Sequence, residues 1–250
     1  MTNYNELTKN LETLQLTKMI EMLPNIIDDS IKNNTPFIEV LYKLTELEIK
    51  FRDDRARRIN VTVSHFPFYR TIKEFDFNYQ PSINRKEIED LVSLRFIEAK
   101  SNIIFMGSSG VGKTHLATAI GIEAASQRIS TYYINFAKLM EKIKLAAKEN
   151  RLETVIKHYL KYTLLIIDEV GYVPVDKDAS SGFFQLIAAR YEYRSTIITT
   201  NQTFSKWGDI FGDASITAAI IDRLVHHCSI IKINGMSYRL KGKGLYEDDK

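Results

Sequence analysis

The sequence has one cysteine, Cys228, among its 250 residues. A single thiol excludes an internal disulfide and any cysteine-rich zinc module, and it is typical of proteins from a reducing compartment. No uncharged apolar run approaches the roughly 20 residues of a membrane span. Residues 1–15 also lack the apolar stretch of a signal peptide. We therefore expect a cytoplasmic protein with no membrane partner.

Neither sign of charge dominates the composition. The 34 Lys and Arg residues against 31 Asp and Glu residues give a net charge of +3. This balance permits nucleic-acid binding without requiring it, so any basic surface must be local. The length allows one sizeable α/β core and a small accessory domain.

The apolar pattern changes once along the chain. Up to residue 59 the apolar residues recur at helical spacing, broken at Pro24 and Pro36, which predicts a small all-helical N-terminal domain over residues 1–65. We expect this domain to bind DNA or a partner, or to mediate oligomerisation. From residue 66 onward, after an aromatic linker, β-rich runs alternate with helical patterns, which predicts a parallel sheet flanked by helices. The predicted strands are residues 102–106, 131–135, 164–167, 195–199 and 229–233.

A phosphate-binding motif follows the first predicted strand and precedes a helical stretch at residues 115–125. It fits G-x-x-x-x-G-K-[ST] and comprises Gly107, Ser108, Ser109, Gly110, Val111, Gly112, Lys113 and Thr114. The glycines let backbone N–H groups wrap a phosphate closely, and the helix N-terminus adds positive charge. Lys113 is expected to reach the β- and γ-phosphates and Thr114 to bind Mg²⁺, with His115 completing the segment. A coincidental glycine-rich turn is disfavoured by the flanking strand and helix.

Two carboxylates end the third predicted strand, at the edge where ligands bind in open α/β sheets. Asp168 is expected to hold the magnesium shell and Glu169 to polarise the attacking water. Alone this pattern is weak, because apolar strands often end in Asp. The fourth strand, expected beside this one, ends in Thr200 and Asn201. Asn201 either orients the water or caps a turn, and the sequence leaves open which of the two residues faces the phosphate.

The motifs favour an ATPase over other P-loop classes. The Asp-Glu pair indicates hydrolysis, and although residues 168–171 fit the D-x-x-G of GTPases, no N-K-x-D guanine reader follows. No arginine-rich lid of a small-molecule kinase is evident. ATP and Mg²⁺ are therefore the expected cofactors.

Residues 68–241 resemble the insertion-sequence helper ATPases called IstB, which are related to DnaC-type helicase loaders in the AAA+ superfamily. The helical N-terminus matches only in length and character. The matching segments are residues 75–77, 107–116, 167–172, 190–192, 195–201, Trp207, 222–224 and 235–239.

That resemblance implies an AAA+ core and an ATP-dependent homo-oligomer on duplex DNA that recruits and activates a partner transposase and influences target-site selection. It implies that Asn201 is the first sensor and that Arg223 is an arginine finger completing a neighbouring subunit's site. Only 250 − 233 = 17 residues follow the last strand. We therefore expect no helical lid, and we name no second sensor arginine. The alternatives are a replicative helicase loader, a small-molecule P-loop kinase and a DNA clamp that scarcely turns over.

Two basic clusters are candidates for DNA contact. Residues 138–161 hold seven basic residues against three glutamates, with Lys144, Lys148 and Arg151 on one predicted helical face. Such rows give salt-dependent, sequence-tolerant binding, although a solvated helix face is the competing interpretation. The resemblance favours DNA contact, since this insert corresponds to the helices through which relatives grip DNA. The candidates are Lys138, Lys142, Lys144, Lys148, Arg151, Arg55, Arg57 and Arg58; the last three, with Arg52, could equally pair internally.

Four other residues stand out by type. His226 and His227 have no Asp or Glu at metal-ligand spacing, so we interpret them as structural. Arg190 and Arg194 either contact a neighbouring subunit or form surface salt bridges.

Overall fold

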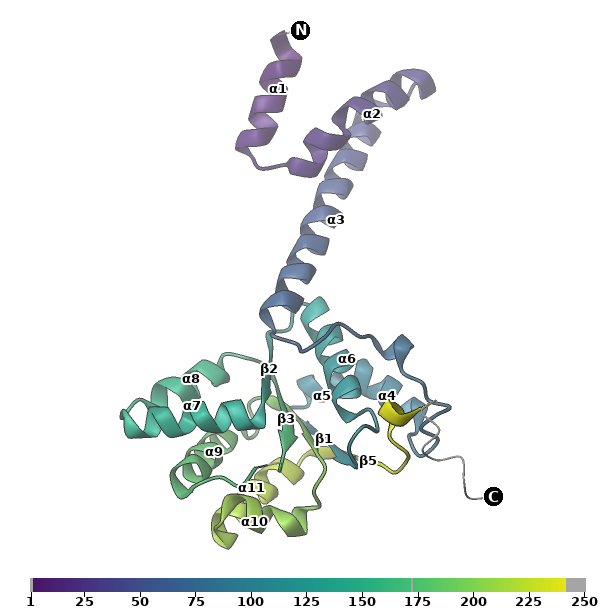
Figure 1. Ribbon diagram of the computed structural model, residues 1–250. Coiled ribbons are helices and arrows are strands. Elements are labelled where there is room, and N and C mark those ends of the chain that lie inside the picture. Colours follow the sequence, from purple (N-terminus) through teal and green to yellow (C-terminus); the bar gives the residue numbers. More distant parts are fainter. Residues whose placement is uncertain (1, 172, 242–250) are drawn as a thin grey trace. The chain divides into compact units, whose positions relative to one another are not determined.

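The computed structural model describes residues 2–171 and 173–241 (Figure 1). The chain forms two compact units, Met1–Ile59 and Asn60–Lys250. Helix α3 (Phe37–Val63) crosses this division and ends two residues before the predicted boundary after residue 65. That residues 1–65 form a domain with a function of its own stays a prediction.

The first unit contains α1 (Thr2–Thr13), α2 (Thr17–Asn33) and the first part of α3. Its small core consists of Leu11, Met19, Leu23 and Leu44. The predicted break at Pro24 is wrong, because α2 continues through this proline and loses only the one hydrogen bond that its missing N–H would have made. Pro36, by contrast, immediately precedes α3.

A buried carboxylate organises this unit. Glu48 of α3 is only 3% exposed and accepts hydrogen bonds from the backbone N–H groups of Lys18 and Met19, at the start of α2. Arg52 donates to the same carboxylate at 2.9 Å. Arg52 therefore pairs internally.

The second unit is built on a five-stranded parallel sheet in the order β2-β3-β4-β1-β5. The five predicted strands and the predicted pairing of the third with the fourth are confirmed. Their bounds are β1 Asn102–Gly107, β2 Thr131–Asn135, β3 Leu164–Val170, β4 Ser195–Thr200 and β5 Cys228–Ile233. Because β4 inserts between β1 and β3, the phosphate loop and the two carboxylates lie two strands apart.

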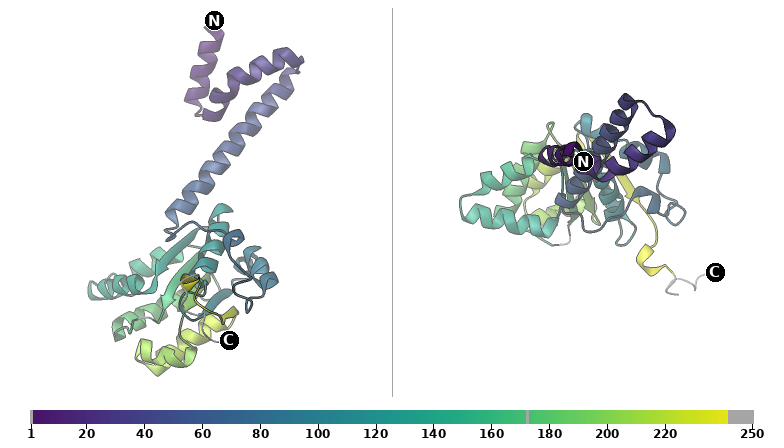
Figure 2. Two further views of the ribbon diagram at one scale, coloured as in Figure 1. Left: turned by 45° about the vertical axis from the view of Figure 1, so that its right-hand side comes forward. Right: turned by 90° about the horizontal axis from the view of Figure 1, so that it is seen from above.

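Helices cover both faces of the sheet, as Figures 1 and 2 show. Ile103 and Ile166 belong to the core on the side of α4 (Arg85–Val92), α5 (Arg95–Glu98) and α6 (Lys113–Ser126), while Ile104 and Ile167 belong to the opposite core. Successive strand residues thus face opposite layers, which is why the strands are apolar throughout. The helices of the second layer are α7 Phe136–Lys148, α8 Leu152–Leu160, α9 Lys177–Arg190, α10 Trp207–Phe211 and α11 Ala214–Val225.

Three short 3₁₀ turns complete the described chain: η1 Ile72–Glu74, η2 Phe204–Lys206 and η3 Tyr238–Leu240. Within the described residues only η3 follows β5, and residues 242–250 lie outside them. No helix among the described residues combines the length and apolar character that a bilayer crossing requires.

Candidate nucleotide-binding site

The loop between β1 and α6 has the conformation that its glycines predict. Gly110 and Gly112 have φ values of +80° and +102°, which side chains other than glycine rarely adopt. A Cβ on Gly112 would also lie 2.6 Å from a ring carbon of Phe75. Lys113 begins α6 and donates from Nζ to the carbonyl oxygens of Gly107 at 2.8 Å and Ser108 at 2.6 Å. The ammonium group is therefore held inside the loop, at a helix N-terminus suited to an anion.

The pKa of Lys113 is lowered from its ordinary value. Burial lowers its pKa, the Asp168 carboxylate raises it, and the nearby Arg239 guanidinium lowers it again. A phosphate group bound here would supply the negative charge that two neighbouring cations favour.

Asp168 is a buried carboxylate that accepts hydrogen bonds from three hydroxyl groups. Its Oδ1 accepts from Thr114 Oγ1 at 2.9 Å and from Thr199 Oγ1, and its Oδ2 accepts from the Tyr133 phenol at 2.5 Å. Burial and the charge of Asp168 raise the pKa of Tyr133, so this phenol stays a donor. The adjacent Thr114 hydroxyl and Asp168 carboxylate are hard oxygen ligands of the kind that Mg²⁺ requires, so this donor set fits the ion.

Glu169 is turned toward the cavity by an irregularity in β3. Its φ is +64°, and the pairing of β3 with β4 shifts register between Ile167 and Val170. Its backbone N–H donates to Thr199 Oγ1, and its Oε2 accepts from Asn135 Nδ2 at 2.7 Å. Bulges of this kind commonly re-aim a side chain near an active site.

A cavity of about 790 Å³ joins these groups. The phosphate loop, Asp168, Glu169, Thr199, Tyr133 and Asn135 line one part of it, and residues from the segment 67–80 line another. Phe75 and His115 meet edge to face with ring centroids 5.3 Å apart. His115 donates from Nε2 to the Thr71 carbonyl at 3.0 Å, and burial lowers its pKa, so the ring is neutral at pH 7. The cavity thus combines a phosphate cradle with an aromatic wall.

The sequence assigns no role in the site to several lining residues, among them Tyr133, Asn135, Thr199 and Arg239. Arg239 is brought here because the Tyr238 backbone N–H donates to the Gly110 carbonyl at 2.9 Å, fastening η3 to the phosphate loop. The segment 235–239 is matched in the resemblance, but a contact across more than 100 residues leaves no local signal.

The cavity lining does not include Asn201 or Arg223. Thr200 does not face the phosphate loop, because its hydroxyl donates to the Val170 carbonyl and accepts from Gln202 N–H. Asn201 Oδ1, in contrast, is buried and has no hydrogen-bond partner among the described residues. Arg223 of α11 donates to the Ala219 carbonyl, and its guanidinium lies over the Phe184 ring at 4.9 Å.

The basic candidates are exposed but not all on one face. The predicted common face of Lys144, Lys148 and Arg151 is wrong, because α7 ends at Lys148 and Arg151 lies at the start of α8. Lys144 also pairs with Asp176 at 2.5 Å. Lys142 and Arg151 line a groove of about 360 Å³ between α7 and α8. Lys138 is exposed on α7, as are Arg55, Arg57 and Arg58 on α3.

Both interpretations of Arg190 are wrong. Its side chain is 1% exposed and donates to the carbonyl oxygens of Tyr159, Tyr162 and Ser195 and to the Thr196 hydroxyl. Arg190 therefore joins the end of α9 to the starts of β3 and β4, a structural role inside the core. Arg194 is half-buried and donates to the Leu160 carbonyl at 3.3 Å.

Comparison with known proteins decides the family. The family model of IstB-like ATP binding proteins matches residues 9–245. The chain belongs to this family. Among IstB-like relatives, an insertion sequence IS232 ATP-binding protein of Bacillus thuringiensis is 49% identical over 99% of both chains. The insertion sequence IS21 ATP-binding protein of Pseudomonas aeruginosa is 35% identical over 95% of this chain and 90% of its own.

Solved structures agree on the fold. A crystal structure of DnaI is similar with a TM-score of 0.56 and 21% identity, over 66% of this chain and 90% of its own. The DnaC helicase loader gives a TM-score of 0.52 and 22% identity, over 70% of this chain and 98% of its own. With the sheet order β2-β3-β4-β1-β5, these likenesses show that this IstB-like protein shares the fold of the DnaI and DnaC structures, with the parallel sheet flanked by helices that the sequence predicts.

Proposed function

We propose that the protein is a magnesium-dependent ATPase that oligomerises on duplex DNA and recruits and activates a partner transposase. One observation carries the catalytic part: Asp168, bonded to Thr114 of the phosphate loop, lies beside a Glu169 that is aimed into the same cavity. Membership of the IstB-like family supports ATP as the nucleotide. The names of the relatives, which are insertion sequence proteins, support transposition as the process.

Each residue has a distinct role in this proposal. Backbone N–H groups of residues 107–114 and the Lys113 ammonium bind the β- and γ-phosphates, and Thr114 and Asp168 hold Mg²⁺. When bound, Mg²⁺ supplies positive charge against the phosphate oxygens. Glu169 accepts a proton from the attacking water. Asn201, whose buried Oδ1 has no hydrogen-bond partner among the described residues, lies outside the cavity lining and would orient that water after turning toward it.

The contact between Asn135 and Glu169 belongs to a resting state of the ATPase site. Glu169 Oε2 already accepts a hydrogen bond from Asn135, which holds the carboxylate in one orientation. Release of Glu169 from Asn135 on DNA binding or assembly would couple hydrolysis to the assembled state.

The position of Arg223 supports oligomerisation. Arg223 lies outside the cavity of its own chain, and its guanidinium rests on the Phe184 ring and forms no ion pair with a carboxylate among the described residues. In a neighbouring copy the same guanidinium would reach the γ-phosphate and stabilise the charge of the transition state.

Mutation of the loop and the carboxylate tests the catalytic proposal. Lys113→Ala should abolish ATP binding measured by calorimetry, whereas Glu169→Gln should bind ATP with Mg²⁺ and hydrolyse it at a small fraction of the wild-type rate. Lys100→Ala, a lysine away from the cavity, is the control. Undiminished nucleotide affinity in Lys113→Ala would show that the nucleotide does not bind at this loop. Measuring the size of the protein complex on duplex DNA, with and without ATP, tests whether the protein oligomerises there.

Charge reversal on α7 tests the DNA surface. Lys138→Glu with Lys142→Glu should weaken duplex binding and reduce the slope of log K against log salt by about two, because each phosphate contact contributes about 0.9. Arg85→Glu with Lys86→Glu on α4 makes the same change in net charge and is the matched control. Equal weakening by both pairs would show that α7 is not the DNA surface. Activation of a replicative helicase, but not of a transposase, would replace the proposed partner.

A further inference from the structure

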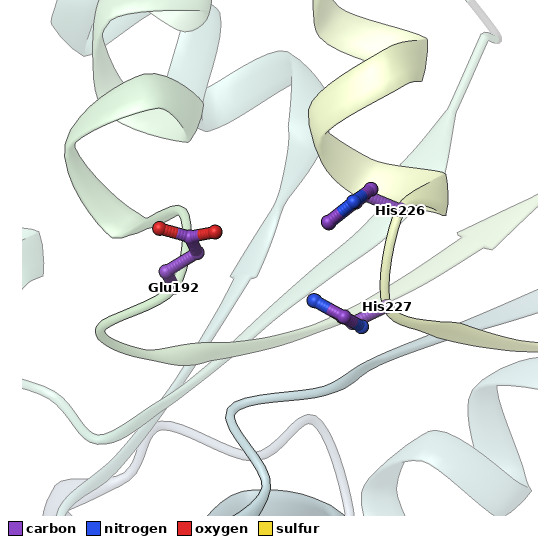
Figure 3. Close-up of side chains that lie close together, drawn as sticks. All are labelled: Glu192, His226 and His227. Atoms are coloured by element: carbon purple, nitrogen blue, oxygen red, sulfur yellow. The ribbon is translucent and has the colours of Figure 1, made fainter.

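Three exposed side chains with metal-binding groups converge at one corner of the second unit. Glu192 lies in the turn between α9 and β4, and His226 and His227 lie between α11 and β5 (Figure 3). One ligand atom from each residue lies within 4.8 Å of the other two. The fold brings Glu192 to the two histidines across 34 residues of sequence. The interpretation of the histidines as structural is therefore no longer the only one that the structure supports.

The backbone under this cluster is fixed by the sheet. The Asn102 N–H, at the start of β1, donates to the His227 carbonyl at 2.7 Å, and His226 N–H donates to the Asp222 carbonyl at the end of α11. Glu192 has a φ of +63° inside a turn in which the N–H groups of Tyr193 and Arg194 both donate to the Arg190 carbonyl. The three ligand positions are thus anchored, and only exposed side-chain torsions need to change on binding.

A neighbouring tyrosine already orients one imidazole. The Tyr191 hydroxyl lies 3.0 Å from His226 Nδ1. Metal-binding histidines usually engage their second nitrogen in such a hydrogen bond, which fixes the ring and leaves the other nitrogen for the metal. The rings of His226 and His227 meet with centroids 4.2 Å apart. The two imidazole rings and the Glu192 carboxylate lie around a shared space, as Figure 3 shows.

We propose that Glu192, His226 and His227 form a binding site for a zinc ion, separate from the nucleotide site. Two imidazoles and one carboxylate suit Zn²⁺, whereas Mg²⁺ and Ca²⁺ prefer oxygen ligands. Zinc–nitrogen distances are about 2.0–2.1 Å, so the side chains close inward by rotation when the ion binds. Three protein ligands leave a fourth position for water or for a group from another molecule.

Zinc at this place would brace the end of α11. His226 lies three residues, about one helical turn, after Arg223, and the ion would tie this end of the helix to the turn that holds Glu192. If Arg223 acts on a neighbouring subunit, which rests on the proposed function, zinc would restrict the motion of that arginine. The zinc site itself does not depend on that role.

Zinc titration of the untagged full chain, without nucleotide or magnesium, tests the site. Calorimetry or competition with a chromophoric chelator should give one zinc ion per chain. Loss of a residue that only hydrogen-bonds to a zinc ligand typically weakens zinc binding roughly 10–100-fold. We expect a larger loss of affinity from each variant that removes a ligand itself: Glu192→Gln, His226→Ala and His227→Ala. Tyr191→Phe, which removes the orienting hydroxyl only, should weaken it about tenfold.

Two controls separate this site from other zinc ligands. His158→Ala removes an exposed histidine on α8, and Cys228→Ser removes the thiol next to His227; both should bind zinc as the wild type does. Thermal melting of each variant without zinc checks that it is folded. Any of three results would overturn the proposal. The wild type could fail to bind one zinc ion per chain, the folded triple variant of Glu192, His226 and His227 could still bind zinc, or Cys228→Ser could abolish zinc binding. ATP binding measured in parallel separates this result from the proposed function.

Discussion

Thr199 of β4 donates its hydroxyl hydrogen to Asp168 Oδ1 of the neighbouring strand β3. Thr199 Oγ1 in turn accepts a hydrogen bond from the Glu169 backbone N–H at 2.9 Å. One side chain therefore positions both carboxylate-bearing residues: Asp168 through its carboxylate and Glu169 through its backbone. Thr114 donates to the same Asp168 oxygen from α6, so the phosphate loop and β4 are joined through a single buried carboxylate.

Replacing Thr199 with Val tests this relationship. The substitution keeps the shape but removes a donor to Asp168 and an acceptor for Glu169 N–H, so we expect ATP turnover to fall at least tenfold with ATP affinity nearly retained. Thr200→Val is the matched control, because its hydroxyl bonds to the Val170 carbonyl and not to Asp168. Both variants should lose about 1–3 kcal/mol of stability in urea unfolding. An equal loss of turnover in both would mean that Thr199 has no specific role.

Replacing Asn135 with Ser tests the restraint on Glu169. Asn135 also caps α7, since its Oδ1 accepts from Ala137 N–H at 3.0 Å, and serine retains this capping ability but is too short to reach Glu169. We expect DNA-independent ATP hydrolysis to rise several-fold, because the carboxylate is then free to turn toward the attacking water. Asn84→Ser, at the cap of α4, is the control. A basal rate that stays the same or falls would contradict the restraint.

Arg223→Ala tests hydrolysis across a subunit interface. The variant should bind ATP normally and hydrolyse it on the order of a thousandfold more slowly. Mixing it with Lys113→Ala should restore part of the activity, since one partner then supplies the arginine and the other the intact phosphate loop. Arg194→Ala, which removes an arginine that bonds to the Leu160 carbonyl of its own chain, is the control. Full turnover by a monomeric Arg223→Ala protein would exclude the role.

His115 predicts a pH dependence of stability. Burial lowers its pKa in the folded state below the ordinary value of 6.5. As pH falls through about 6.5, the unfolded chain binds the proton first, so protonation favours unfolding. His115→Gln should remove this contribution, and urea unfolding without nucleotide at about pH 7.5 and 5.5 should show a smaller loss of stability than in the wild type. An identical loss in both proteins would contradict the buried, neutral state of His115.

The sequence by itself determined the features that are encoded within one short segment of the chain. Residues 107–114 specify their own loop, because the glycines fix its backbone and the flanking strand and helix follow directly. The apolar runs specified the strands, because a sheet covered on both faces requires apolar residues on both sides. The family resemblance added the AAA+ type of core, which spacing alone does not distinguish from other P-loop folds.

The tertiary structure alone decided which distant residues meet. Tyr133 and Thr199 reach Asp168 only because β3 lies between β2 and β4. Arg190 is buried because three strand and helix ends present carbonyl groups to it, although its sequence context is that of a surface arginine. Glu192 meets His226 for the same reason. Sheet order and side-chain burial follow from the packing of the whole chain, and local patterns do not encode them.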